Sequence, residues 1–259
     1  MEMWSRKKMK EIGRSRLKAN YWKSVLVAAI LLILTGAGNV TASSSTSRGS
    51  EEETVVTTEM TTESIEEVEE EEPLYPNYAG MVIAGLFVLL VVAIIFAVVI
   101  ALTVFVINPI TVGCHRFFYR NLDKNADVKE VCYPFDRHYK TIVKTMFFRD
   151  LYTVLWSLLF IIPGIVKFYE YSMIPYLLAE NETMTREEAF AESKRLMKGN
   201  KWREFVLDLS FIPWLLLSGM TFGIVGVLYT CPYIQSTGAA FYQAVKEEDM
   251  FRAIVVEEQ

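Results

Sequence analysis

The chain is poor in the residues that most often carry chemistry. Among its 259 residues there are only two histidines and three cysteines. Cys114, Cys132 and Cys231 are odd in number and follow no framework spacing, so the sequence predicts no disulfide scaffold. It contains no Walker motif, dinucleotide-binding glycine fingerprint, nucleophile elbow or zinc-protease helix. We therefore predict no enzymatic activity, no cofactor and no metal site.

Charged residues are missing from one long stretch, and this absence points to the fold class. Residues 79–107 contain no charged side chain, and 52% of the whole chain is hydrophobic. Because a bilayer's hydrocarbon core takes about 20 apolar residues per helix, this stretch predicts a transmembrane span. Further apolar runs complete a predicted all-α integral membrane bundle of six transmembrane helices. Their approximate ranges are 22–40, 79–107, 145–162, 164–180, 204–218 and 222–245.

The segment 41–77 has the opposite character. It carries eleven glutamates and a single basic residue, Arg48. Its apolar content is too low to offset its conformational entropy, so we predict a disordered acidic loop outside the cytoplasm. A cleaved signal peptide is the alternative interpretation of the preceding residues, because a basic start and an apolar run lead to Val40-Thr41-Ala42, which resembles a cleavage site. Both interpretations place the loop on the outer side.

The basic residues indicate the topology. With six spans, 24 of the 26 lysines and arginines fall in inner segments, as the positive-inside rule requires. We therefore expect a multi-pass protein of a bacterial cytoplasmic membrane with both termini in the cytoplasm. Since this rule already accounts for the basic connectors, they do not indicate binding to nucleic acid. The lipid bilayer is the expected partner, and a second protein or a second copy of the chain is possible.

Pro163 and Gly164 interrupt the apolar region 145–180, which is too long for one crossing. Pro-Gly is a strong turn signal, so we predict a helical hairpin with its tip at these two residues. Lys167 then lies about one turn from the tip, where its stem can extend to the lipid headgroups. Glu170 follows three residues later on the same helix face, and we predict that it pairs with Lys167.

Asp208 lies about one turn inside the fifth predicted span. Its expected partners are basic groups at the inner boundary, namely Arg149, Lys201 or Arg203. Charges inside a membrane indicate a functional polar site by default. The alternative is that they orient and lock the helices at the bilayer boundary. The candidate intramembrane polar site consists of Lys167, Glu170 and Asp208.

Residues 185–199 predict an amphipathic helix on the cytoplasmic side. Thr185 and Glu188 have the spacing of a capping box, and Gly199 can close the helix. Its apolar side chains fall on one side at helical spacing. The helix then lies on the inner membrane surface, or it packs against the protein's own cytoplasmic face.

Four segments resemble one uncharacterised family of multi-pass bacterial membrane proteins that is common in Gram-positive organisms. They are NPITVGCHRFFYRNL from Asn108, LLFIIPGIVKFYEYSMIPYLLAEN from Leu158, AFAESKRLMKGNKWREFVLDLSFIPWLLLSG from Ala189 and PYIQSTGAAFY from Pro232. The family has no established activity. It is distantly similar to the membrane domain that accompanies some glycerophosphodiester phosphodiesterases, which implies a role in envelope or lipid biology and transfers no active-site residue.

Two functions are compatible with these observations. The first is a non-catalytic membrane scaffold or accessory subunit that acts through protein partners, lipids or both. The second is a small transporter or permease component, in which Lys167 and Glu170 line a polar path.

Overall fold

The computed structural model describes residues 5–35, 78–136, 138–181 and 183–257, and every regular element in these ranges is helical. The predicted all-α class is confirmed for this part of the chain. The described residues fall into two units, one formed by 5–35 and 101–257 and the other by 78–100. The predicted acidic loop 41–77 and the end of the first predicted span lie outside the described residues.

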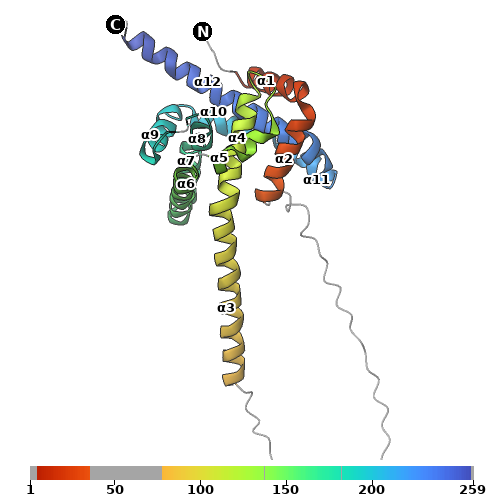
Figure 1. Ribbon diagram of the computed structural model, residues 1–259, viewed down its shortest axis with the longest axis vertical. Helices are drawn as coiled ribbons and strands as arrows, with labels where there is room; N and C mark the ends of the chain where they lie inside the picture. The colour runs from red at the N-terminus through yellow and green to blue at the C-terminus, as the bar shows by residue number, and fades with distance from the viewer. Residues whose placement is uncertain (1–4, 36–77, 137, 182, 258–259) are drawn as a thin grey trace, which may run out of the picture. The chain divides into compact units, whose positions relative to one another are not determined.

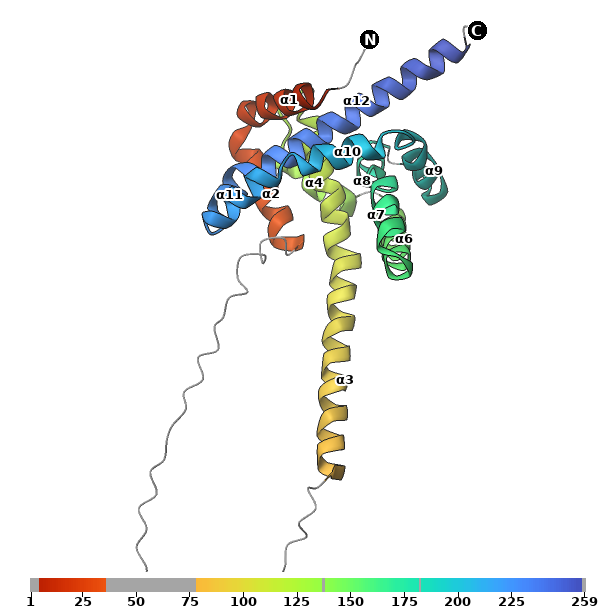
Figure 2. The same ribbon diagram turned by 180° about the vertical axis from the view of Figure 1, so that it is seen from behind.

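The first two helices meet at a sharp bend. Helix α1 (Arg6–Ala19) begins after Ser5, whose side chain caps it, and α2 (Tyr21–Thr35) follows at an angle of 107°. Helix α1 lies along α12 (Cys231–Glu257), as Figures 1 and 2 show. The two helices come close at Gly13, where a Cβ atom would lie 3.0 Å from the Cα atom of Thr237. The missing side chain of Gly13 permits this approach.

Helix α3 (Tyr78–Leu102) is apolar throughout, and all its described side chains are exposed. The π-helical turn η2 (Thr103–Ile107) and helix α4 (Asn108–Arg120) continue it without a break. The helix therefore continues beyond the end of the predicted span 79–107. The Asn108 amide donates to the Thr103 carbonyl five residues back. Pro109 then lies in the first turn of α4, where its missing N–H is tolerated.

Helices α6 (Tyr139–Leu159) and α7 (Ile161–Glu170) form a hairpin, but its turn lies at Phe160 rather than at Pro163-Gly164. Phe160 is extended, with φ −154° and ψ 140°, and separates the two helices. Pro163 lies in the first turn of α7, where a helix has no acceptor for its amides. A Cβ atom on Gly164 would lie 2.6 Å from the Cα atom of Ser157, so Gly164 lets the two arms approach closely. The short helices η3 (Val128–Cys132) and α5 (Tyr133–Asp136) precede this hairpin.

Proline divides two further predicted runs. The run 164–180 becomes α7 and α8 (Ile174–Glu180), and the run 204–218 becomes α10 (Lys201–Leu209) and α11 (Ile212–Met220). Pro175 and Pro213 each lie in the first turn of the second helix of their pair, because a proline fits there without losing a hydrogen bond. The π-helical turn η4 (Gly226–Thr230) leads into α12 just before Pro232.

Helix α9 (Arg186–Leu196) has the predicted capping box. The Glu188 amide donates to Thr185 Oγ1 at 3.3 Å, and the Thr185 amide donates to Glu188 Oε2 at 2.9 Å. Gly199 adopts φ +86° beyond the end of the helix, as predicted. Ala189 and Leu196 are buried, and α9 contacts α6, α8 and α12. The apolar side of this helix therefore covers the protein itself.

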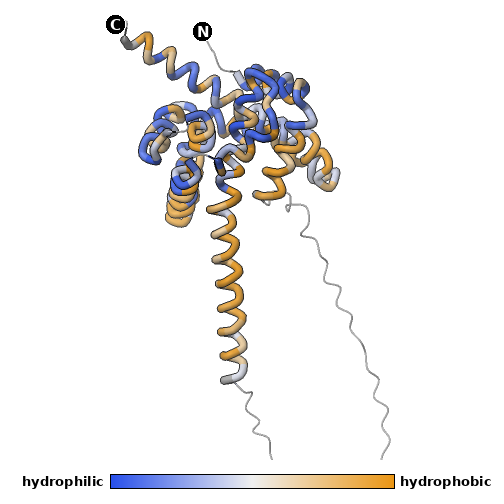
Figure 3. The backbone as a smooth tube through the Cα atoms, viewed as in Figure 1, coloured by the Kyte–Doolittle hydropathy of each residue, from blue (hydrophilic) through white to orange (hydrophobic). Residues whose placement is uncertain are grey.

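One helical stretch within the described ranges, Gly80–Arg120, is long and apolar enough to cross a membrane, and the bent pair α1–α2 is a second candidate if it forms a single span. The six-span arrangement stays a prediction. In the larger unit, the apolar ends of α2 and of the α6–α7 hairpin extend to the same side, and the mainly hydrophilic α1 lies on the other (Figure 3).

Candidate functional site

Glu170 is a buried carboxylate that bridges two lysines. It lies at the end of α7 and is 5% exposed. Lys167 Nζ is 2.7 Å from Glu170 Oε1, which confirms the predicted pair. Lys201 Nζ, from the first turn of α10, is 2.5 Å from Glu170 Oε2. The Ser193 hydroxyl of α9 donates to the Glu170 carbonyl at 2.7 Å. Glu170 thus joins three helices, and its single negative charge faces two lysines.

Asp208 has a different partner from those predicted. It accepts a hydrogen bond from the Tyr169 hydroxyl at 3.2 Å, and no ion pair to it is found among the described residues. The three basic residues that we expected near it are bound to other carboxylates. Arg149 binds Asp150, Lys201 binds Glu170, and Arg203 binds Glu248. The predicted site is therefore split, since Lys167 and Glu170 form one cluster and Asp208 belongs to another.

A cavity of about 530 Å³ lies between α4, α6, α7, α8, α10 and α12, and we call it the acidic groove. Glu204 and Asp208 of α10 line it, one helical turn apart on the same face. The Ser172 hydroxyl donates to Glu204 Oε2 at 2.7 Å. The lining residues with ionisable or hydroxyl side chains are His115, Arg149, Asp150, Thr153, Tyr171, Ser172, Tyr176, Glu204 and Asp208.

The two carboxyl groups of α10 are the acidic groups of this groove that no basic side chain pairs with among the described residues. Arg149 and Asp150 neutralise each other, with Arg149 Nε 2.9 Å from Asp150 Oδ1, and Asn108 donates to Asp150 Oδ2 at 2.7 Å. Glu204 and Asp208, by contrast, are bound only by hydroxyls among the described residues. A carboxylate without a cation is costly away from water, so these two groups favour either an added cation or an added proton.

His115 contributes a neutral imidazole to the opposite wall. Its Nδ1 is 2.7 Å from the Thr111 carbonyl oxygen, so Nδ1 carries the proton and Nε2 is left as an acceptor. Desolvation is the main cause that lowers the pKa of His115 to about 4. The positive charge of Arg149 also lowers this pKa, whereas the hydrogen bond to Thr111 raises it. The ring is uncharged at neutral pH.

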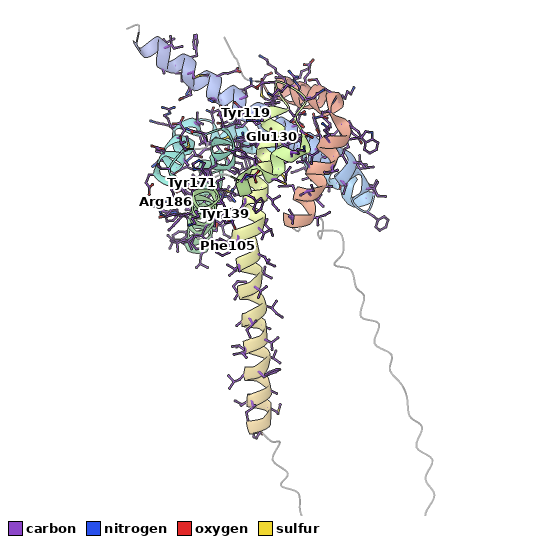
Figure 4. All side chains as sticks on the ribbon, viewed as in Figure 1. Phe105, Tyr119, Glu130, Tyr139, Tyr171 and Arg186 are labelled. Atoms are coloured by element: carbon purple, nitrogen blue, oxygen red, sulfur yellow. The ribbon has the colours of Figure 1, made fainter. Side chains whose placement is uncertain are left out.

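Tyr176 places a phenol on the groove without a hydrogen-bond partner. The residue is 6% exposed, and its ring stacks on Tyr242 with centroids 5.1 Å apart and meets His115 edge-on at 4.5 Å. Its hydroxyl makes no hydrogen bond to any residue that the structure describes. The hydroxyl lies beside Gly238, since a Cβ atom added to that glycine would be 2.9 Å from the Tyr176 oxygen. Tyr171, labelled in Figure 4, also lines the groove.

Comparison with known proteins identifies the family. The family described as "Protein of unknown function (DUF975)" matches residues 3–249. The chain belongs to this family. No curated protein and no solved structure matches it significantly. All residues that line the acidic groove lie inside the range that matches this family of unknown function.

In this DUF975 member, two polar clusters fix α4, which forms one wall of the groove. Arg116 Nε donates to Glu130 Oε2 of η3 at 2.9 Å. Tyr119 and Tyr242 donate to Glu180 of α8 at 3.0 and 2.6 Å, respectively. Tyr119 and Glu130 are labelled in Figure 4. Among the described residues there is no group of three or more His, Cys, Asp or Glu side chains that could hold a metal ion.

Sequence reasoning did not single out Glu204 or Tyr176. Glu204 stood at the edge of a polar connector, where a glutamate is unremarkable on composition alone. The four-residue spacing from Glu204 to Asp208 was the available signal, because it places both carboxylates on one helix face. No local signal pointed to Tyr176, since its position on the groove depends on α4 and α12.

Proposed function

We propose that the protein is a non-catalytic, multi-span integral membrane protein of a bacterial cytoplasmic membrane that binds a polar ligand in the acidic groove. The single observation that carries the binding role is the cavity of about 530 Å³ with two carboxyl groups that no basic side chain of the described residues pairs with. Its volume is within the range of about 300 to 1,000 Å³ typical of small-molecule sites.

The membrane part of the proposal rests on the apolar surface and on the charge distribution. The described side chains of α3 are exposed along the whole helix, and Phe160 at the hairpin tip is exposed as well. Apolar surface of this extent is costly in water and is normal against lipid tails. The inner placement of the lysines and arginines supports cytoplasmic termini.

Either of the two functions expected from the sequence needs a ligand site, and two positions for that site can be compared. A polar path at Lys167 and Glu170 is unfavourable, because two lysines already saturate this carboxylate. The ligand site of an accessory subunit or a permease component is better placed at Glu204 and Asp208. The resemblance to phosphodiesterase membrane domains is compatible with a ligand from envelope or lipid metabolism.

Native mass spectrometry of the protein, extracted gently from its host membrane, tests the proposal. Gly238→Leu fills the groove, and Gly219→Leu is the matched control on an open helix surface, where an added Cβ meets nothing within 4 Å. We expect a small bound species on the wild-type and Gly219→Leu proteins and its loss from Gly238→Leu. If all three proteins carry only the same protein partner, the role is scaffolding and the binding proposal is wrong.

A further inference from the structure

We infer that the acidic groove binds the protonated amine of an organic ligand, through Glu204, Asp208 and the hydroxyl of Tyr176. This inference rests on the proposed binding function and names the chemical class of the ligand. Three independent features of the groove support it, namely its charge, its unpartnered phenol and its aromatic walls.

The acidic residues of the groove favour a cationic ligand. Arg149 is paired with Asp150, and Lys201 is bound to Glu170. His115 is neutral, so the two carboxyl groups on α10 have no basic partner among the described residues. An ammonium group is a compact cation with several donors, which two carboxylates one turn apart can share.

The phenol of Tyr176 supplies an acceptor on another wall. The residue is 94% buried, and its hydroxyl has no hydrogen-bond partner in the described part of the chain. Because Tyr176 lines the groove, a bound donor can satisfy it there.

The remaining walls favour an organic amine over a bare ion. Phe168, Tyr171, Phe211 and Phe241 all line the cavity. Aromatic faces attract organic cations, and they also cover the carbon skeleton that such a cation carries. The volume of about 530 Å³ is far larger than a metal ion needs and leaves room for that skeleton.

Binding of benzylamine to the purified full-length protein in detergent tests the inference, with benzyl alcohol as the neutral control ligand. We expect benzylamine to raise the thermal unfolding midpoint in a concentration-dependent manner and benzyl alcohol to leave it unchanged. The E204Q/D208N double variant should lose the effect, and D123N, which removes an exposed carboxylate outside the groove, should keep it. Equal shifts with both ligands, or an unchanged shift in the double variant, would overturn the inference.

Tyr176→Phe keeps the inference testable if the double variant does not fold, because this substitution removes only one oxygen atom. Circular dichroism should match the wild type, and benzylamine should bind about tenfold more weakly, since a hydrogen bond to a charged group is lost. Unchanged affinity for benzylamine in Tyr176→Phe would contradict the role given to its hydroxyl.

A second experiment identifies the source of the amine. Native mass spectra are recorded from nanodiscs of phosphatidylglycerol with and without phosphatidylethanolamine. Retention of phosphatidylethanolamine by the wild type and its loss from E204Q/D208N would assign the amine to a lipid headgroup, whereas benzylamine binding without lipid retention would assign it to a soluble amine. If Gly238→Leu removes a native ligand but neither amine binds, the binding function stands and the amine inference is wrong.

Discussion

Replacing Glu170 by glutamine should destabilise the protein without abolishing ligand binding in the groove. The carboxylate is 5% exposed, while the side chains of Lys167 and Lys201 are 23% and 30% exposed. Glutamine keeps the shape, but only one of its two terminal atoms is an acceptor, and the two lysines lie at different terminal atoms of Glu170. The other lysine then faces the amide NH₂ group, which is also a donor.

The magnitude follows from these two contacts. A hydrogen bond to a charged group contributes about 1.5–3 kcal/mol, so the loss of one and the weakening of the other should cost about 2–3 kcal/mol. For a chain of this size, 1 kcal/mol corresponds to about 2–4 °C, so the unfolding midpoint in detergent should fall by about 4–12 °C.

Glu192→Gln is the matched control, because Glu192 and Arg195 form an exposed i,i+3 pair at 2.6 Å with 29% and 61% exposed side chains. Such a pair contributes at most about 1 kcal/mol, so its midpoint should change by only a few degrees. The reasoning would be refuted if Glu170→Gln unfolded at the wild-type temperature and lost the groove ligand, because Glu170 would then be a binding residue.

Four further substitutions or modifications test the packing, the capping, the topology and the burial of a thiol. Gly13→Ala should lower the free energy of unfolding by about 1–3 kcal/mol, because its new methyl group collides with α12. Gly85→Ala is the control, since a Cβ atom there meets nothing within 4 Å, and it should not lower the stability. Equal thermal unfolding midpoints for the two variants would contradict the tight contact at Gly13. Thr185→Ala removes the capping box of α9 and should cost about 1 kcal/mol in chemical denaturation; no change would argue against the cap. Exposed Cys132 should react with a membrane-impermeant maleimide only from the cytoplasmic side, and labelling from the outer side would contradict the topology. Cys114, whose pKa burial raises to about 12, should stay unreactive at pH 8, because thiolate forms only as the pH approaches that value.

Local sequence patterns predicted much of the helical structure. The capping box at Thr185, the left-handed Gly199 and the Lys167–Glu170 pair all depend on residues within four positions of one another or on a single backbone conformation. The hairpin was expected from the length of the apolar region, but its turn was placed three residues too late. Pro163 was interpreted as the turn, yet a proline is equally well accommodated in the first turn of the helix that follows.

The partners of charged side chains were predicted less well. Lys201 and Arg203 were expected to pair with Asp208, but the fold brings Glu170 and Glu248 to them instead. Arg149, the third expected partner, binds its chain neighbour Asp150. Glu170 recruits Lys201 from 31 positions away, and this contact exists only because α10 lies against the end of α7. An ion pair between helices depends on their packing, which charge spacing along the chain does not encode.

The sequence by itself determined the all-helical class, the segregation of charge and the local start and end signals of several helices, because these follow from composition and from interactions within a few residues. Only the tertiary structure decided which carboxylates are neutralised and which are left open. Glu170 is enclosed by two lysines, while Glu204 and Asp208 face a cavity whose other walls come from α4, α6, α8 and α12. A cavity is the space left between packed helices, so its lining depends on side chains that are distant in the sequence, such as Tyr176 beside Gly238.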